Sequence, residues 1–348
     1  MSAARVGRRV QVGALSIVLG LAAACGGGSG GSRPSTPTTP SVPTTPTTPP
    51  TPVNTWSASG QIVALGTTQG IGGATLTPGW PLAAVSADEQ GNYTIGDVAN
   101  PASTPYPVTL SAGGMISHDV WITWARGSRT GVNLDMIRNA APFNMEFYRQ
   151  FARDTFDSDQ GAPFPLLRWT TAPSFYVRTV DQNGRAIEPE VLAVTLDALT
   201  RGVQGYTGGR YSPAAIETGT EVRPQAAGWI NVDIRRDPGE RQVCGQAFVG
   251  ANPGQITLND DVCSCGSIKI PGAVTMHEVG HAMGFFHVSD RNSLMFPFAS
   301  GDCPAGALSS AEAFHAAVVY SRPRGNTEPD HDPSSGAALT AGHPLLVR

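Results

Sequence analysis

The chain has 348 residues and a formal net charge of −4, and its basic residues are nearly all arginine. This balance argues against a polybasic surface and therefore against nucleic acid as a partner. The length leaves room for two folded domains with additional terminal segments.

Residues 1–25 have the pattern of an export signal. Arg5, Arg8 and Arg9 precede an uncharged apolar run that is too short to span a bilayer. The run ends in Leu-Ala-Ala-Ala-Cys at Cys25, which resembles a bacterial lipobox whose cysteine is lipidated. The resemblance implies an exported protein of the bacterial cell envelope, anchored to a membrane through Cys25. Ordinary signal cleavage, which would release a soluble secreted protein, is the alternative.

Residues 26–55 form a linker, first rich in Gly and Ser and then in Pro and Thr. Such a segment cannot bury enough apolar surface to fold, so we expect a disordered and partly extended spacer.

Residues 56–137 contain short alternating runs separated by Gly, Pro and Asn clusters. Several strands at this spacing predict a small all-β sandwich. The runs that carry a resemblance to the carboxypeptidase regulatory-like domains are residues 59–63, 73–76 and 88–93. The resemblance implies a β-sandwich fold, and no catalytic constellation is visible in this part of the chain.

Residues 138–321 mix helical and strand patterns, which predicts an α+β domain. We expect strands at 173–178, 229–234 and 255–258, and helices from Pro189 to about Gly205, from near Pro271, and from Ser309 to Tyr320. Ser309 and Glu312 have the spacing of a capping box at the start of the last helix.

The sequence from His277 to His287 reads H-E-x-x-H-x-x-G-x-x-H. Histidines four residues apart on a helix share one face, so His277 and His281 can reach one metal ion. Glu278 then points beside the metal, where a base can take a proton from a bound water. Gly284 can take a left-handed backbone, end the helix and bring His287 round as the third ligand. Three nitrogen ligands leave a fourth position open, which is the catalytic arrangement.

Met295 follows His287 within the run Asn-Ser-Leu-Met-Phe-Pro. With the histidine motif, this run resembles the metzincin zinc peptidases, whose Met-turn runs beneath the three zinc histidines. The resemblance implies a twisted mixed sheet, an active-site helix and one catalytic Zn²⁺. The turn looks like the matrixin version. Astacins and serralysins carry a metal-binding tyrosine two residues after the Met, and the residues after Met295 up to Phe298 include no tyrosine. A tyrosine-bound metal is therefore not expected, and Val288 leaves the subfamily open.

This resemblance implies a monomeric zinc endopeptidase that hydrolyses extracellular or envelope proteins or peptides. In that chemistry Glu278 activates the zinc-bound water and then protonates the leaving amine. Two alternatives stay open: a non-catalytic surface-binding lipoprotein with a structural zinc site, and a hydrolase of cell-wall peptides.

By the same likeness, residues 256–258 would form the edge strand that pairs with an extended substrate. An internal strand is the equally weighted alternative.

Five cysteines are present, and lipidation of Cys25 would leave an even set. In an oxidising compartment the candidates for two disulfides are Cys244, Cys263, Cys265 and Cys303. Only one residue separates Cys263 from Cys265, so we expect each to bond to Cys244 or Cys303.

The residues after the last helix, 322–348, are rich in Pro, Gly and polar side chains, and we expect a flexible tail. His331 and His343 lie in this tail without partners at ligand spacing, so neither is assigned to the metal.

Overall fold

In a computed structural model of the protein, the chain divides into two units, residues 1–51 and 52–348. The structure describes residues 55–79, 83–99, 106–122, 127–158, 163–237, 243–260, 270, 272–298, 306–334 and 344–347, all within the second unit. The expected signal segment, Cys25 and nearly all of the linker lie outside the described residues.

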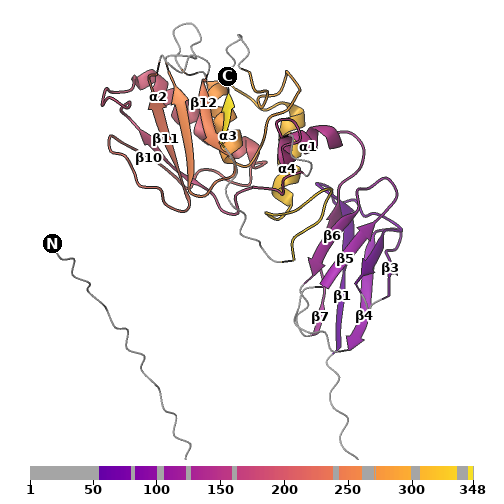
Figure 1. The fold of residues 1–348 in the computed structure, drawn as a ribbon. Coiled ribbons are helices and arrows are strands. Elements are labelled where there is room, and N and C mark those ends of the chain that lie inside the picture. Colours follow the sequence, from indigo (N-terminus) through magenta and orange to yellow (C-terminus); the bar gives the residue numbers. More distant parts are fainter. Residues whose placement is uncertain are drawn as a thin grey trace, which may run out of the picture. The chain divides into compact units, whose positions relative to one another are not determined.

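The described residues up to Met136 contain strands but no helix, and they form two sheets (Figure 1). One sheet contains β1 (Thr55–Ala64), β4 (Asn92–Ala99), β7 (Gly127–Arg129) and β8 (Leu134–Met136). The other contains β2 (Thr75–Pro78), β3 (Val85–Ser86), β5 (Tyr106–Ser111) and β6 (His118–Ile122). Alternate side chains from both sheets share one buried core, for example Ile62 and Ile95 from the first sheet with Leu76 and Leu110 from the second.

The rest of the described chain combines four helices with a six-stranded sheet in the order β10-β9-β11-β13-β12-β14. The helices are α1 (Met145–Arg153), α2 (Pro189–Tyr206), α3 (Gly272–Ala282) and α4 (Ser310–Ser321). The strands are β9 (Ser174–Arg178), β10 (Ala215–Gly219), β11 (Trp229–Arg235), β12 (Gly245–Phe248), β13 (Gly254–Asn259) and β14 (Pro344–Val347). Strands β10, β9, β11 and β13 are parallel, and β12 runs antiparallel to both of its neighbours. Helices and mixed sheets together give the α+β class that the sequence predicts.

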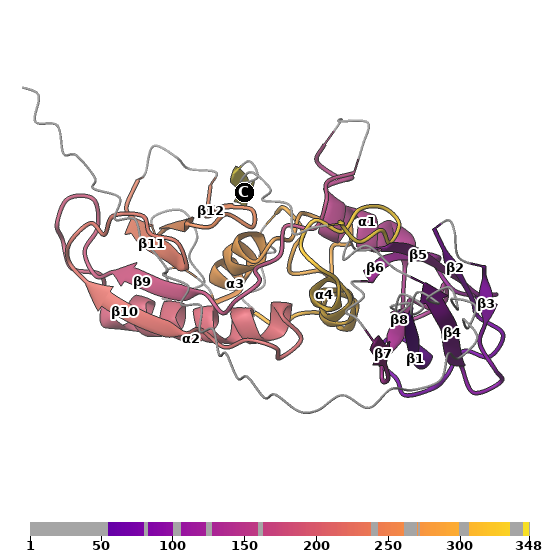
Figure 2. The ribbon, with the colours of Figure 1, turned by 90° about the horizontal axis from the view of Figure 1, so that it is seen from below.

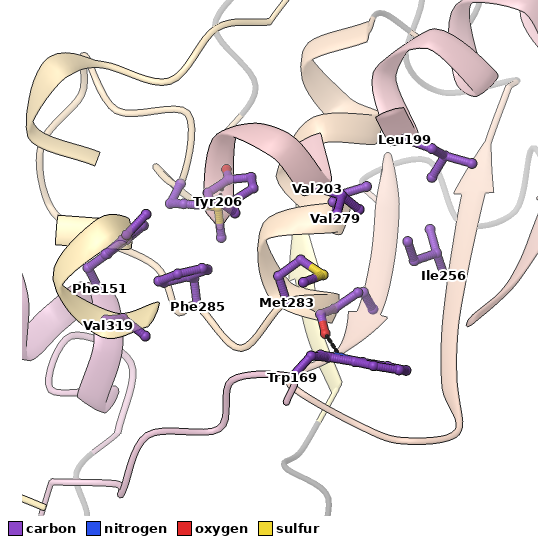
Figure 3. Close-up of a cluster of buried hydrophobic side chains, with 14 of the residues drawn as sticks. Phe151, Trp169, Leu199, Val203, Tyr206, Ile256, Val279, Met283, Phe285 and Val319 are labelled. Carbon is purple, nitrogen blue, oxygen red and sulfur yellow. Dashed lines mark hydrogen bonds between the residues drawn. The ribbon is translucent and has the colours of Figure 1, made fainter. Parts of the chain in front are cut away.

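Helices α2 and α3 cover one face of this sheet (Figure 2). Strand residues alternate between that face, where Val232 and Ile256 are buried, and the opposite face, where Asn231 and Gln255 are partly exposed. Figure 3 shows this core, in which Leu199 and Val203 of α2 lie near Val279 of α3. Burial of these apolar side chains fixes α3 against the sheet and so positions the histidine motif.

Side chains satisfy backbone groups at the start of α4 and at the end of α3. The Ser309 side chain accepts a hydrogen bond from the Glu312 amide, and the Glu312 side chain accepts one from the Ser309 amide, so the predicted capping box is present. At the end of α3 the buried indole of Trp169 donates to the Ala282 carbonyl over 2.8 Å, which satisfies one of the last helical carbonyls (Figure 3).

The prediction of an edge strand at residues 256–258 is wrong. These residues belong to β13, which lies between β11 and β12 inside the sheet. The strand beyond it is β12, and its outer side is paired with the C-terminal strand β14. The alternating pattern of residues 254–259 reports which face of the sheet each side chain lies on, so it could not tell an edge strand from an internal one.

Residues 322–334 differ from the flexible tail that we expected. Asn326 and Asp330 are fully buried, and Arg322 is 2% exposed. Arg322 forms ion pairs with Asp330 and with Asp135, so this segment is tied to β8. Buried charges require partners, and the polar composition of this segment supplies them.

His331 also has a partner, the carboxylate of Asp119 in β6, which the sequence did not indicate. His343 lies outside the described residues. Within the described part of the chain, no helix has the length and apolar character that a membrane crossing requires.

Candidate metal centre

The helix α3 places His277, Glu278 and His281 in the interior of the protein. His277 is 3% exposed, and Glu278 and His281 are fully buried. One turn of helix separates the two histidines, and their Nε2 atoms lie 2.9 Å apart. Both rings therefore face one point.

The chain reverses directly after α3 and brings in the third histidine. Gly284 has a φ of +105°, which is costly for a residue with a Cβ atom. A side chain there would also press on the backbone of Leu167 and Arg168. The reversal places Nε2 of His287 3.2 Å from Nε2 of His281, so the structure brings the three histidines together as the sequence predicts.

Each imidazole uses its Nδ1 atom for a hydrogen bond to an acceptor. Nδ1 of His277 donates to the Leu294 carbonyl over 2.6 Å, and Nδ1 of His281 donates to the Phe285 carbonyl over 2.8 Å. Nδ1 of His287 donates to Oδ2 of Asp157 over 2.5 Å. With the ring proton held at Nδ1, the Nε2 lone pairs of all three rings are available to a metal ion.

Burial favours the neutral form of His277 and His281. It lowers the pKa of His277 to about 3, with a further contribution from His287. Burial also lowers the pKa of His281 well below its usual range, and the neighbouring histidines add to the effect. Neutral imidazole is the form that binds zinc, and the three convergent Nε2 atoms fit a Zn²⁺ ion with a fourth position open.

Glu278 is the acidic group of this centre, and it is isolated. Among the described residues neither of its carboxylate oxygens has a hydrogen-bond partner. Burial without such a partner raises the pKa of Glu278 well above its usual range. Gly245 of β12 lies directly beside the carboxylate, and a Cβ atom at that position would overlap Oε1. Because Gly245 has no side chain, the Glu278 carboxyl group has space beside β12.

Met295 lies beneath the histidine helix, as a Met-turn methionine does in the predicted fold. It is fully buried, and the Tyr206 hydroxyl donates to its sulfur over 3.0 Å. A side chain at Gly280 would collide with the same sulfur, so helix and turn are in close contact. The Val288 amide donates to the Met295 carbonyl over 3.0 Å, which closes the loop between the third histidine and the turn.

Glu312 of α4 holds the turn in place. Its Oε1 atom accepts hydrogen bonds from the Ser293 hydroxyl over 2.6 Å and from the Met295 amide over 3.0 Å. Its Oε2 atom accepts from the Ser309 amide over 2.7 Å as part of the capping box. One fully buried carboxylate therefore caps α4 and shapes the turn below the metal centre.

Two of the supporting residues were not found from the sequence. Asp157 precedes His287 by 130 residues and follows the end of α1, so no spacing signal links it to the motif. The second task of Glu312 was also missed, because the capping-box pattern accounts for only one of its oxygens.

The remaining predicted positions have mixed outcomes. Phe298 is 57% exposed and brings no oxygen to the centre. Cys244 is buried and forms a disulfide bond, and its partner cysteine lies outside the described residues. Cys263, Cys265 and Cys303 all lie outside the described residues, so the pairing remains a prediction.

Residues 239–310 match the family model of Matrixin, a family of M10 peptidases. The match covers less than half of the chain, and it includes the histidine motif and Met295. It supports a metzincin-like domain of a protease-type enzyme in this part of the chain. Matrixins use zinc, and the three convergent histidines could bind that metal. No curated protein matches the chain.

Among solved structures, two of the matches come from unrelated settings. A type II cohesin–X-dockerin complex from Acetivibrio cellulolyticus, an N-terminal interface mutant, has 16% identity and a TM-score of 0.19, covering 24% of this chain and 57% of that chain. A DUF3823 family protein from Parabacteroides merdae has 15% identity and a TM-score of 0.20, covering 25% of this chain and 47% of that chain. The chain thus spans about half the length of each, and scores this low support no inference.

Replacing Asp157 by Asn tests its role in orienting His287. The amide oxygen can still accept from Nδ1, but the negative charge that makes the ring more basic is lost. We expect zinc affinity to fall about 10-fold, within the 10–100-fold range found for such supporting groups. Competition with a chromophoric chelator measures it. Asp197→Asn, an exposed change on α2, is the matched control, and equal affinities for the two variants would contradict the assignment.

Comparing Glu312→Ala with Ser309→Ala separates the two tasks of Glu312, the cap of α4 and the support of the Met295 turn. Ser309→Ala removes the cap alone, for an expected loss of about 1 kcal/mol in the free energy of unfolding. Glu312→Ala also removes the acceptor of the buried Ser293 hydroxyl and one of the two acceptors of the Met295 amide, which keeps only Oγ of Ser293 at 3.1 Å. We therefore expect a loss of about 3 kcal/mol. Urea unfolding of the two variants measures the difference, and similar losses would show that the turn does not depend on Glu312.

Proposed function

We propose that this protein is a zinc-dependent endopeptidase that cleaves extracellular or envelope proteins. The observation that carries the proposal is the convergence of three Nε2 atoms on a helix that also bears a buried carboxyl group with no partner among the described residues. A purely structural zinc site does not require such a carboxylate. Desolvating Glu278 costs free energy without any compensating bond, which favours a role for Glu278 in chemistry. The Matrixin match supports the same class of chemistry.

In this proposal His277, His281 and His287 hold the zinc through Nε2. Zinc, when bound, supplies a Lewis acid that polarises the scissile carbonyl and lowers the pKa of the attacking water. Glu278 takes a proton from that water and later delivers it to the nitrogen of the leaving amine. Burial raises the pKa of Glu278 and so makes its carboxylate a stronger base, and the positive charge of a bound metal would favour the ionised form that accepts the proton.

Strand β12 is the element that would align the substrate. It runs beside Glu278, and its outer edge already accepts an antiparallel strand, β14 of the same chain. An extended peptide could form the same backbone hydrogen bonds in place of β14, which is how peptides add to a sheet edge. This assignment replaces the edge strand that we expected at residues 256–258.

The proposal extends to where the enzyme works. The signal pattern and the lipobox-like end at Cys25 support export and lipid anchoring to a bacterial membrane, and the Pro/Thr linker would hold the folded part away from that membrane. A monomer acting on protein or peptide substrates is the working form that we propose.

Replacing Glu278 by Gln tests the chemistry. Gln has nearly the same shape but cannot accept the proton, so we expect zinc content to stay unchanged and casein cleavage to fall by about 10²–10⁴-fold. Glu190→Gln, an exposed change in the first turn of α2, should leave cleavage unaffected. Wild-type cleavage by the Glu278→Gln protein would overturn the mechanism. Wild-type cleavage of cell-wall peptides without cleavage of casein would instead favour the cell-wall hydrolase.

Replacing Cys25 by Ser tests the anchor. The thiol is the group that receives the lipid, so we expect the wild-type protein in the membrane fraction of the producing bacterium and the variant in the soluble fraction. Incorporation of radiolabelled palmitate should be lost in parallel. Equal membrane association and labelling of both proteins would rule out lipidation at Cys25.

A further inference from the structure

A second group of metal-binding side chains lies where β6 meets the segment that follows α4. His118 comes from β6, and Asp330 and Asp332 come from residues 322–334. Each of the three residues offers one ligand atom, and these atoms all lie within 4.8 Å of one another. None of the three belongs to the histidine motif.

The imidazole ring of His118 faces the carboxylates of Asp330 and Asp332 through its Nε2 atom, which has no hydrogen-bond partner among the described residues. Its Nδ1 atom lies 2.9 Å from the Asp135 carbonyl, which can only accept, so Nδ1 carries the proton. Nε2 then carries a lone pair and has no hydrogen-bond partner, although the side chain is only 5% exposed. It faces Oδ2 of Asp332 at 3.3 Å and Oδ1 of Asp330 at 3.7 Å. A lone pair facing carboxylate oxygens repels them unless a proton or a metal cation lies between them. Burial lowers the pKa of His118, but Asp332 and Asp330 raise it above its usual range, so this site attracts positive charge.

Both carboxylates are held in place by other groups. Arg322 donates from Nε and Nη2 to the two oxygens of Asp330, each over 2.7 Å. Asn326 donates from Nδ2 to Oδ1 of Asp330 over 2.9 Å and to Oδ1 of Asp332 over 2.8 Å. Oδ2 of Asp332 is thereby left facing His118. Fixed ligands of this kind are what outer hydrogen bonds provide around metal ions.

The two separations measured from Nε2 of His118 fit a bound ion. Two ligands bound at 2.0–2.2 Å in tetrahedral geometry lie about 3.4 Å apart. The separations of 3.3 and 3.7 Å from Nε2 of His118 bracket that value. They also resemble the 2.9 and 3.2 Å between the histidine nitrogens of the candidate metal centre.

The charge of the group fits a divalent ion as well. The carboxylates of Asp135, Asp330 and Asp332 contribute three negative charges, and Arg322 contributes one positive charge. With His118 neutral, the net charge is therefore −2. A divalent cation would balance it fully, whereas a proton on His118 would balance only half.

We propose that His118, Asp330 and Asp332 bind a second divalent cation of the zinc type, distinct from the ion of the candidate metal centre. One imidazole with two carboxylates suits zinc and its first-row neighbours, while calcium and magnesium prefer oxygen ligands alone. The Asp332 side chain is 17% exposed, which leaves water access to a fourth position. The ion joins β6 of the sandwich to the segment after α4, so its role is structural.

Metal content of the full-length chain tests the proposal. After equilibrium dialysis against a buffered zinc solution, we expect mass spectrometry to find two zinc ions per wild-type chain. Asp332→Asn should bind one ion, His277→Ala should bind one, and the double variant should bind none. His331→Gln is the matched control, because this neighbouring histidine is 41% exposed and pairs with Asp119 instead. It should retain two ions.

Thermal unfolding keeps the test valid if a variant folds poorly. Zinc should raise the melting temperature of His277→Ala, which retains only the second site, and should not raise that of His277→Ala/Asp332→Asn. A single ion in the wild-type chain, lost in His277→Ala, would overturn the second site and leave the proposed peptidase intact. Two zinc ions bound to a wild-type chain that does not cleave casein would support the second site and overturn the proposed peptidase. If His118 instead carries a proton and pairs directly with the carboxylates, zinc will leave the melting temperature of His277→Ala unchanged, which also overturns the proposal.

Discussion

Three buried imidazoles can aim their Nε2 atoms at one point only if each Nδ1 proton has an acceptor. The acceptors come from three separate parts of the chain: the Leu294 carbonyl in the turn, the Phe285 carbonyl in the reversal after α3, and the Asp157 carboxylate after α1. A ring without its acceptor would carry an unsatisfied buried donor or rotate away. The reversal at Gly284, the position of α1 and the shape of the Met-turn therefore depend on one shared requirement.

The same interior must also accept a carboxyl group that makes no bond. Gly245 on the neighbouring strand leaves room for the Glu278 carboxyl group, and no donor among the described residues bonds to its oxygens. The supporting carboxylate behaves in the opposite way, because Glu312 uses both of its oxygens. Glu278 and Glu312 are both buried and lie 34 positions apart in the sequence, but Glu278 has no hydrogen-bond partner among the described residues, whereas both oxygens of Glu312 are bonded.

Local patterns predicted the elements that carry the centre, and longer-range contacts escaped them. The helix from Pro189, the capped helix at Ser309 and the histidine spacing all follow from periodicity or short motifs, and the structure has each of these elements. The edge of the sheet was misplaced because β12 has only four residues, begins with glycine and contains no β-branched side chain. Asp157 could not be found either, since a carboxylate 130 residues away leaves no periodic trace. Partner choice across the fold depends on packing, which composition alone does not specify.

The segment after α4 also changes where the peptidase part of the chain ends. The guanidinium of Arg153, fully buried at the end of α1, donates to the backbone oxygen of Asn326 over 2.6 Å and to its side-chain oxygen over 2.7 Å. Trimming the chain back to residue 321 would leave that charge buried without these acceptors, a loss that proteins rarely tolerate. The smallest fragment that keeps Arg153 paired must include Asn326, and keeping Asp330 bonded to Arg322 carries it several residues further. A protease-resistant fragment of this protein should therefore end well beyond its last helix.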